Sequence, residues 1–224
     1  SIEHKMGIKA SATAVLNFDK AKGYLIGPEN KGLNCMFTFM NTARIGTAIQ
    51  GLTAAELAFQ GGLSYAKDRL AMRALSGAKA PEQVADPIIV HPAVRNMVLT
   101  CKAFAEGGRA LVYYLSQFSD VVTKGEGETQ AYADQMLSFL TPIAKAFLTE
   151  TGYEAANHGV QVYGGHGFIR EWGMEQNVRD TRIACLYEGT TEIQALALLG
   201  RKILGTQGAM LKNFTKMIHK FAET

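Results

Sequence analysis

Apolar residues recur every three or four positions through most of this sequence from about residue 34 onward. This spacing places apolar side chains on one face of an α-helix. Long helices are therefore predicted over 34–74, 92–122 and 131–163, and shorter ones over 176–186, 190–204 and 209–221. Long antiparallel helices with short breaks favour an up-and-down four-helix bundle, so the predicted fold class is all-α.

Glycine and proline mark the breaks between these helices and the contacts within them. A loop is predicted over 76–90, Pro92 suits the first position of the next helix, and Pro142 should kink or split the third. Each glycine inside the first helix costs about 1 kcal/mol relative to alanine, so another helix backbone should approach closely there. These glycines are Gly46, Gly51, Gly61 and Gly62.

The first 33 residues lack the helical pattern. A β-branched run at 11–18 predicts a strand, and the turn formers of 19–32 predict a connector. One or two strands cannot form a stable sheet alone. Because the sequence also begins without methionine, we expect it to be a fragment of a longer protein.

Charge and cysteine content argue against several classes of function. A net charge of +3 without a dense Lys/Arg run argues against nucleic acid, and three distant cysteines argue against a zinc site or disulfide framework. No apolar run reaches the roughly 18–20 residues of a membrane span. We expect a soluble protein without a membrane span, cytoplasmic or, in a eukaryote, in the mitochondrial matrix.

The stretch 186–194 places a carboxylate directly beside a helix start. Gly189 permits a sharp turn, and Thr191 with Gln194 three residues later has the form of a capping box. A helix should therefore begin at Thr191 or one residue earlier. Glu188 fits a general base held by that helix, but these residues alone favour a solvated acidic residue near a helix start.

Two motifs, taken together, resemble the C-terminal helical domain of flavin-dependent acyl-CoA dehydrogenases. They are Gln161-Val-Tyr-Gly-Gly-His-Gly-Phe168 and Tyr187-Glu-Gly-Thr-Thr-Glu-Ile-Gln194, with Arg179-Asp180-x-Arg182 between them. The resemblance covers nearly the whole chain, and an insertion after the first long helix is similar to the larger subgroup. It implies that residues 1–33 are the tail of the middle β-domain and 34–224 the C-terminal bundle.

The resemblance also implies a substrate site. Glu188 corresponds to the catalytic base, Tyr187 and Gly189 to the thioester pocket, and Arg44 to the substrate cleft. Some family members carry the base one position before this arginine, where the present sequence has Ala43. Without the resemblance, Arg44 is equally well explained as a structural arginine on an amphipathic helix.

An FAD site that is shared between subunits is implied as well. Contacts to the flavin or its diphosphate are implied for Arg69, Thr190 and Glu192, and contacts to the adenosine half for Gln161, Gly164 and Gly165. Arg69 and the glycine pair would serve a flavin of a neighbouring subunit, which implies a homodimer or homotetramer. Taken alone, the glycines indicate a turn and Arg69 a solvated helix residue.

The implied activity is dehydrogenation of an acyl-CoA thioester to the trans-2-enoyl-CoA, with electrons passed to an electron-transfer flavoprotein. A base must take the weakly acidic α-proton while FAD accepts the β-hydride. Two alternatives remain: an acyl-CoA oxidase that uses oxygen, and a non-catalytic helical or nucleic-acid-binding homologue. The chain alone is expected to be inactive or weakly flavin-bound.

Overall fold

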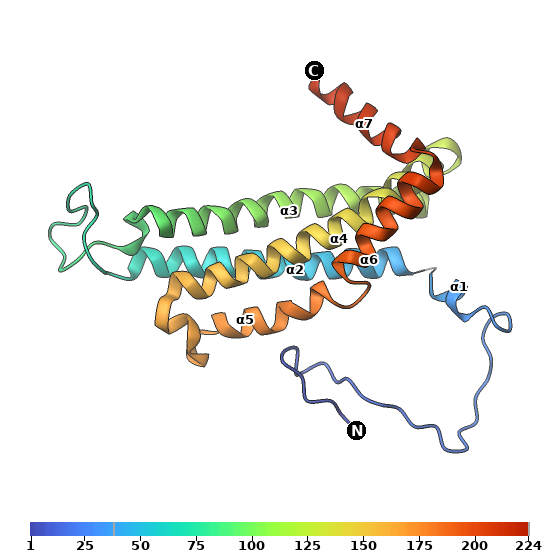
Figure 1. The fold of residues 1–224 in the computed structure, drawn as a ribbon, viewed down its shortest axis with the longest axis horizontal. Helices are drawn as coiled ribbons and strands as arrows, with labels where there is room; N and C mark the ends of the chain where they lie inside the picture. Colours follow the sequence, from blue (N-terminus) through green and yellow to red (C-terminus); the bar gives the residue numbers. More distant parts are fainter. Residues whose placement is uncertain (38, 224) are drawn as a thin grey trace.

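The structure, a computed structural model, describes residues 1–37 and 39–223, and helices dominate this part of the chain. The longest are α2 (Met40–Asp68), α3 (Pro92–Lys124) and α4 (Gly127–Tyr163), which lie side by side and run in alternating directions (Figure 1). The shorter α5 (Met174–Thr181) runs back along α4 and α2. The predicted all-α fold class is confirmed, with α5 as the short fourth member of an up-and-down bundle.

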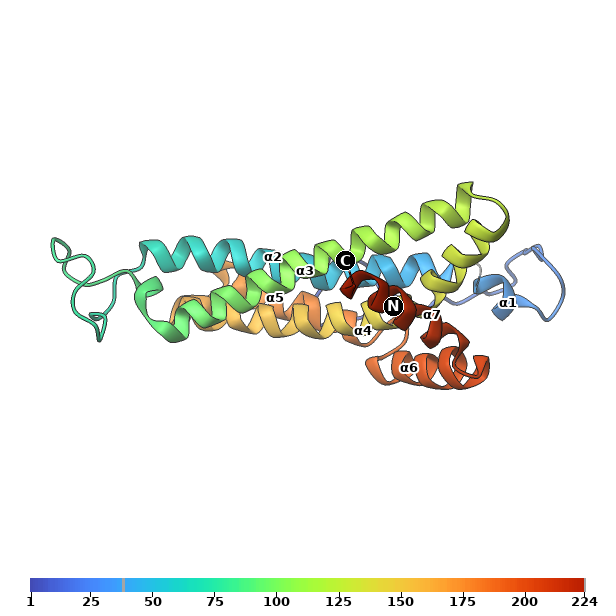
Figure 2. The same ribbon diagram turned by 90° about the horizontal axis from the view of Figure 1, so that it is seen from above.

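Smaller helical elements lie at both ends of this bundle (Figure 2). The α-helical and π-helical ones are α1 (Gly32–Met36), α6 (Thr191–Leu196), the π-helix Ala197–Ile203 and α7 (Ala209–Ala222). The 3-10 turns are Ile88–Val90, Gly164–Phe168, Arg170–Trp172, Arg182–Cys185 and Leu204–Thr206. Among the described residues, no helix combines the length and apolarity needed to span a membrane.

Several predicted helix limits were wrong. The run 34–74 contains two helices, and α2 ends at Asp68 because Arg69 adopts an extended backbone. The third helix begins at Gly127 and continues unbroken past Pro142. Pro142 is buried, and α4 packs against α2 and α3 along its length, so these contacts offset the roughly 3 kcal/mol cost of an internal proline.

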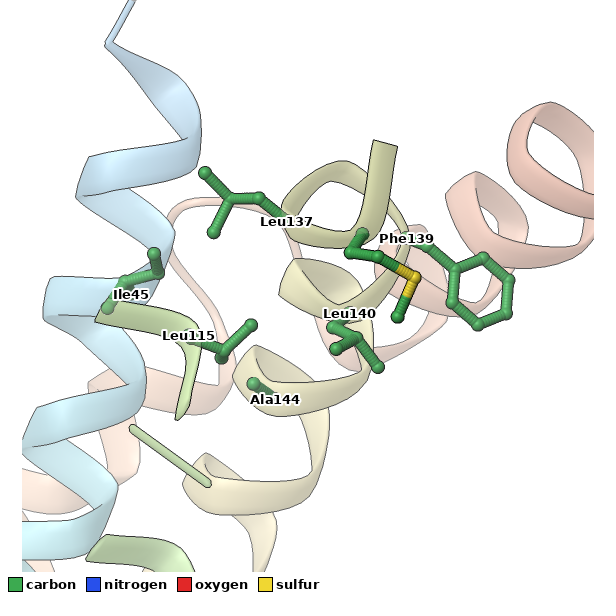
Figure 3. Packing of buried hydrophobic residues seen from close by; sticks show 7 residues of the cluster. Ile45, Leu115, Leu137, Phe139, Leu140 and Ala144 are labelled. Carbon is green, nitrogen blue, oxygen red and sulfur yellow. The ribbon is translucent and has the colours of Figure 1, made fainter. Parts of the chain in front are cut away.

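A hydrophobic core joins the three long helices where α7 covers the bundle. Figure 3 shows Ile45 of α2 and Leu115 of α3 facing Leu137, Leu140 and Ala144 of α4. All of these side chains are buried. On the other side of α4, Phe139 packs against Phe214 of α7, with ring centroids 5.5 Å apart. The core therefore fixes the end of α2 that carries Arg44.

A pair of glycines forms the closest backbone contact between α2 and α4. A Cβ built on Gly51 would lie 2.0 Å from the Leu148 carbonyl oxygen, and one on Gly152 would lie 2.3 Å from the Gly51 carbonyl oxygen. The predicted close approach is thus confirmed at Gly51. It is wrong at Gly46, where no atom lies within 4 Å, because that position faces away from α4 and is exposed.

The expected strand at 11–18 does not form in the described part of the chain. Residues 1–31 contain a single isolated bridge, between Ile2 and Ala14. No further strand lies beside this bridge, and a lone pair of extended segments has too few contacts to persist as a sheet. This segment trails away from the helices before α1 (Figure 1).

The segment around Gly7 is nevertheless attached to α5. The Ile8 amide donates to Asp180 Oδ1 at 2.6 Å, and Arg179 Nη1 donates to the Met6 carbonyl at 2.9 Å. A Cβ on Gly7 would lie 2.2 Å from the Arg179 carbonyl oxygen, so a larger residue does not fit. The Arg-Asp motif therefore anchors the non-helical segment to the bundle, a role that sequence reasoning missed.

The connection between α2 and α3 is organised around the buried carboxylate of Asp86. Its oxygens accept hydrogen bonds from the amides of Ala74, Lys79 and Ala80 at 2.8–2.9 Å, and from Arg73 Nη1 at 3.1 Å. The Ala74 amide, with these other donors, holds the pKa of Asp86 well below its usual value although burial opposes the shift. The predicted loop is therefore an ordered one.

Replacing Asp86 with asparagine should open this connection. The variant loses acceptors for buried amides, so cleavage by a protease within residues 69–91 should accelerate about tenfold. Glu82→Gln, at an exposed position in the same loop, is the control. Because the folded-state pKa is lowered, protection should be complete above the ordinary aspartate pKa of about 3.9 and should fall as the pH drops below it. Equal cleavage of both variants would contradict this role.

Candidate active site

Glu188 lies in a turn with left-handed backbone just before α6. Its φ is 56° and that of Gly189 is 90°, and both residues are half-buried. A non-glycine residue in this conformation costs on the order of 1–3 kcal/mol and persists only where its surroundings hold it. The turn therefore holds the backbone of Glu188 in one conformation, at a cost in backbone energy.

The start of α6 differs in detail from the predicted capping box. The helix begins at Thr191, as expected, but the cap is Thr190, whose side-chain oxygen accepts from the Ile193 amide at 3.4 Å. Thr191 already belongs to the helix, so its hydroxyl cannot cap it, and it donates instead to the Glu150 carboxylate. Gln194 turns back to the carbonyls of the preceding turn.

Arg44 of α2 is close enough to Glu188 for the two charges to interact. Burial lowers the pKa of Arg44, the negative charge of Glu188 opposes this shift, and the positive charge of Arg201 adds to it. The Arg44 Nε atom is buried and has no hydrogen-bond partner among the described residues. The structure therefore brings together the arginine and the carboxylate that the sequence suggested. The Nε–H group of Arg44 can still donate a hydrogen bond.

Tyr187 joins this turn to α2. Its hydroxyl donates to the Gln50 side-chain oxygen, and burial raises the pKa of this phenol. Gln50 in turn lines an open groove of about 440 Å³ between α2 and α5, with apolar walls that include Ile49 and Leu57. Tyr187 is thus hydrogen-bonded to a residue that lines a groove with apolar walls.

Two residues of the first turn of α6 were expected at the flavin. Thr190 lies within the turn as the helix cap, whereas Glu192 is exposed. The backbone amide of Glu192 itself, followed by the Thr190 hydroxyl, holds the pKa of this carboxyl below its usual value. Both residues face the same end of the bundle as Glu188, so the structure groups them with it.

The other predicted cofactor residues lie at the opposite end of α2. Arg69, Gly164 and Gly165 line one open pocket of about 390 Å³. No atom lies within 4 Å of a Cβ built on either glycine, so their backbone is open to a ligand, and Arg69 is exposed beside it. Gln161 is exposed on the last turn of α4 and does not line this pocket.

Three aromatic rings that line this pocket, those of Tyr65, Tyr163 and His166, are held by stacking. Tyr65 stacks on Tyr163 with centroids 4.1 Å apart, and His166 stacks on Trp172 with centroids 4.5 Å apart. The Tyr65 hydroxyl and His166 Nδ1 share a hydrogen bond of 2.9 Å. This packing holds the Gly164–Phe168 turn in place, so the open glycine backbone is presented by a rigid support.

The family relationship follows from comparison with known proteins. Residues 70–204 match the family described as "Acyl-CoA dehydrogenase, C-terminal domain". The chain belongs to the acyl-CoA dehydrogenase family. It is 48% identical over 218 residues to 3-methylmercaptopropionyl-CoA dehydrogenase of Ruegeria pomeroyi, covering 97% of the present chain and 37% of that protein.

Further relatives from the acyl-CoA dehydrogenase family agree. The broad-specificity linear acyl-CoA dehydrogenase of Mycobacterium tuberculosis is 34% identical over 230 residues, covering 100% of this chain and 38% of that protein. Butyryl-CoA dehydrogenase from Megasphaera elsdenii superposes with a TM-score of 0.71 at 27% identity, covering 89% of this chain and 47% of that one. The chain thus spans less than half the length of these relatives.

Sequence reasoning missed two residues that contact the Glu188–Gly189 turn. Lys145 of α4 is completely buried, and its ammonium donates to the Gly189 carbonyl at 2.7 Å. Gln194 is 1% exposed and was interpreted only as part of a cap. A lone lysine within the apolar run 139–148 was the available signal, because a lysine there must bury its charge against a specific partner.

Proposed function

We propose that the enzyme containing this chain dehydrogenates an acyl-CoA thioester to the trans-2-enoyl-CoA, with FAD as cofactor. The observation that carries the proposal is the fixed left-handed turn that holds Glu188 beside Arg44 and the groove next to Tyr187. In this proposal, residues 34–224 form the C-terminal helical domain and residues 1–33 belong to a preceding β-domain.

Glu188 acts as the base in the proposed reaction. Its carboxylate removes the α-proton of the thioester, and the guanidinium of Arg44 lies close enough for the two charges to interact. FAD, when bound, would supply the acceptor for the hydride from the β-carbon, so that both C–H bonds are broken and the carbon–carbon double bond is formed. The apolar wall of the groove beside Gln50 would take the acyl chain.

Anaerobic mixing with acyl-CoA esters tests this function. Butyryl-CoA and 3-methylmercaptopropionyl-CoA, the substrates named for relatives, should bleach the flavin of the intact enzyme. Reoxidation by an electron-transfer flavoprotein and slow reoxidation by oxygen would identify a dehydrogenase, whereas fast reoxidation by oxygen would identify an oxidase. A flavin that stays oxidised with every ester of an acyl-chain series would contradict the proposal.

The proposed FAD contacts also favour an assembly of at least two copies. Arg44 and Arg69 lie at opposite ends of α2, roughly 37 Å apart at 1.5 Å per helical residue. The exposed guanidinium of Arg69 and the open backbone of Gly164 and Gly165 suit the diphosphate and adenosine of FAD. We propose that these residues serve a flavin whose reactive ring lies near Glu188 of a partner copy, in a homodimer or homotetramer.

This chain alone should therefore retain little FAD. The two groups of proposed contacts lie too far apart to enclose one flavin, and the chain spans 37% of the length of its Ruegeria pomeroyi relative. The visible absorbance of flavin, relative to the protein absorbance, measures the occupancy after purification of residues 1–224. One tightly held FAD per chain would contradict this expectation.

A further inference from the structure

The carbonyl groups of the catalytic turn are held by buried side chains from two helices. Gln194 Nε2, from α6, donates to the Glu188 carbonyl at 3.0 Å and to the Gly189 carbonyl at 3.1 Å. Lys145 Nζ, from α4, donates to the same Gly189 carbonyl at 2.7 Å. Consecutive carbonyls of the left-handed turn are thus fixed from both sides.

The burial of both donors makes these contacts obligatory. Lys145 is 0% and Gln194 1% exposed, so neither side chain can exchange its protein acceptor for bulk water. A buried polar group without a partner costs on the order of 1–3 kcal/mol. Loss of the turn would leave both donors unpaired, and loss of either donor would leave the turn free to relax.

The turn also packs closely against the side chain of Gln194. A Cβ on Gly189 would lie 2.6 Å from Gln194 Nε2, so the amide packs directly against the bare glycine backbone. The direction of the Glu188 side chain depends on the φ of that residue, which stays at 56° only while the neighbouring peptide planes are held. The orientation of the carboxylate is therefore coupled to the two carbonyl contacts.

Charges around Lys145 link it to the same residue. Burial lowers the pKa of Lys145, the charges of Cys185, Glu150 and Glu188 oppose this shift, and that of Arg44 adds to it. Lys145 thus combines a hydrogen bond to the turn with a positive charge near the carboxylate, whereas Gln194 supplies hydrogen bonds alone.

We propose that Lys145 and Gln194 are positioning residues that lock the Glu188–Gly189 turn and so aim the Glu188 carboxylate at the substrate. This inference rests on the proposed function, because it assigns the two residues to the orientation of the base. Neither residue touches the reacting atoms. Their effect should appear in kcat rather than in substrate affinity, since a displacement of about 1 Å can cost a hundredfold in rate.

Lys145→Met and Gln194→Met in the intact, flavin-loaded enzyme test the proposal. Each replacement is apolar and similar in length, so it removes the donor while it keeps most of the packed volume. We expect kcat to fall about a hundredfold in each variant, with KM changed less than about threefold. Lys202→Met is the matched control, because this half-buried lysine donates to the Ser138 hydroxyl and not to the turn.

The pH dependence separates the two residues and excludes a merely structural role. Lys145→Met removes a positive charge, so the acidic limb of its kcat profile should move to higher pH, whereas Gln194→Met should leave that limb in place. Lys145→Arg, which keeps the charge and a donor, should recover part of the lost rate. If Lys145→Met merely loosened the packing, the acidic limb would stay in place and Lys145→Arg would not recover the rate.

Each outcome has a defined meaning. If Lys145→Met and Gln194→Met keep parental kcat while Glu188→Gln is inactive, the positioning role is wrong and the proposed function stands. If the parent enzyme fails to bleach with any acyl-CoA, the proposed function itself fails. Should Lys145→Met fail to fold, Gln194→Met carries the test, and failure of both to fold would assign the residues to folding and overturn the proposal.

Discussion

Glu188→Gln should lower kcat for acyl-CoA dehydrogenation by about a hundredfold to ten-thousandfold, the range that a general base supplies. The amide has nearly the shape of the carboxylate but cannot accept the α-proton. Lys145 and Gln194 contact the backbone of the turn, not the Glu188 side chain, so the turn should keep its conformation. Steady-state turnover of the intact enzyme with an artificial electron acceptor measures the effect.

The flavin should stay bound in Glu188→Gln, and its visible spectrum should match that of the parent. Glu106→Gln is the control, because this glutamate lies on the exposed face of α3 and pairs with Lys102. Its turnover should equal that of the parent. A turnover of Glu188→Gln within tenfold of the parent would end the assignment of Glu188 as the base.

Gly51→Ala and Gly152→Ala should destabilise the bundle by at least about 1–3 kcal/mol each, the usual cost of overpacking a core. The added methyl groups would lie 2.0 Å and 2.3 Å from backbone carbonyl oxygens of the opposite helix. Backbone cannot move aside as the end of a flexible side chain can, so α2 and α4 would have to separate. Urea-induced unfolding, followed by helical circular dichroism, measures the change.

Gly46→Ala is the matched control for this pair. It lies on the same helix, α2, but no atom comes within 4 Å of its built Cβ. Alanine should therefore stabilise the protein by about 1 kcal/mol through its higher helix propensity. Equal stability of Gly46→Ala and Gly51→Ala would show that the glycine contact between α2 and α4 has no energetic role.

The sequence predicted the helices well because their signal is repeated over many residues. Pro92 begins α3 as expected, and the long periodic runs correspond to α2, α3 and α4. Local details were less predictable. Gly46 and Gly51 look alike in sequence, since spacing within one helix does not reveal which face meets another backbone.

The candidate site was predictable where one motif carried it. Tyr187, Glu188 and Gly189 are adjacent in sequence, whereas Arg44 lies 144 positions before Glu188 and was suggested by the family resemblance alone. The packing of α2 brings it near Glu188. The contact of Lys145 with Gly189 joins residues 44 positions apart, and no local pattern encodes such a pair. Choosing Thr190 over Thr191 as the cap likewise depends on backbone angles that the sequence leaves open.

The π-helical segment after α6 constrains the length of the chain there. Leu198 and Ile203, five positions apart, both pack against the main core cluster, although in an α-helix they would point about 140° apart. Removal of one residue from Ala197–Ile203 would restore the ordinary winding and rotate everything downstream by about 100°. The apolar side of α7 would then face away from the bundle. The π-helical segment therefore determines which side of the C-terminal helix faces the core.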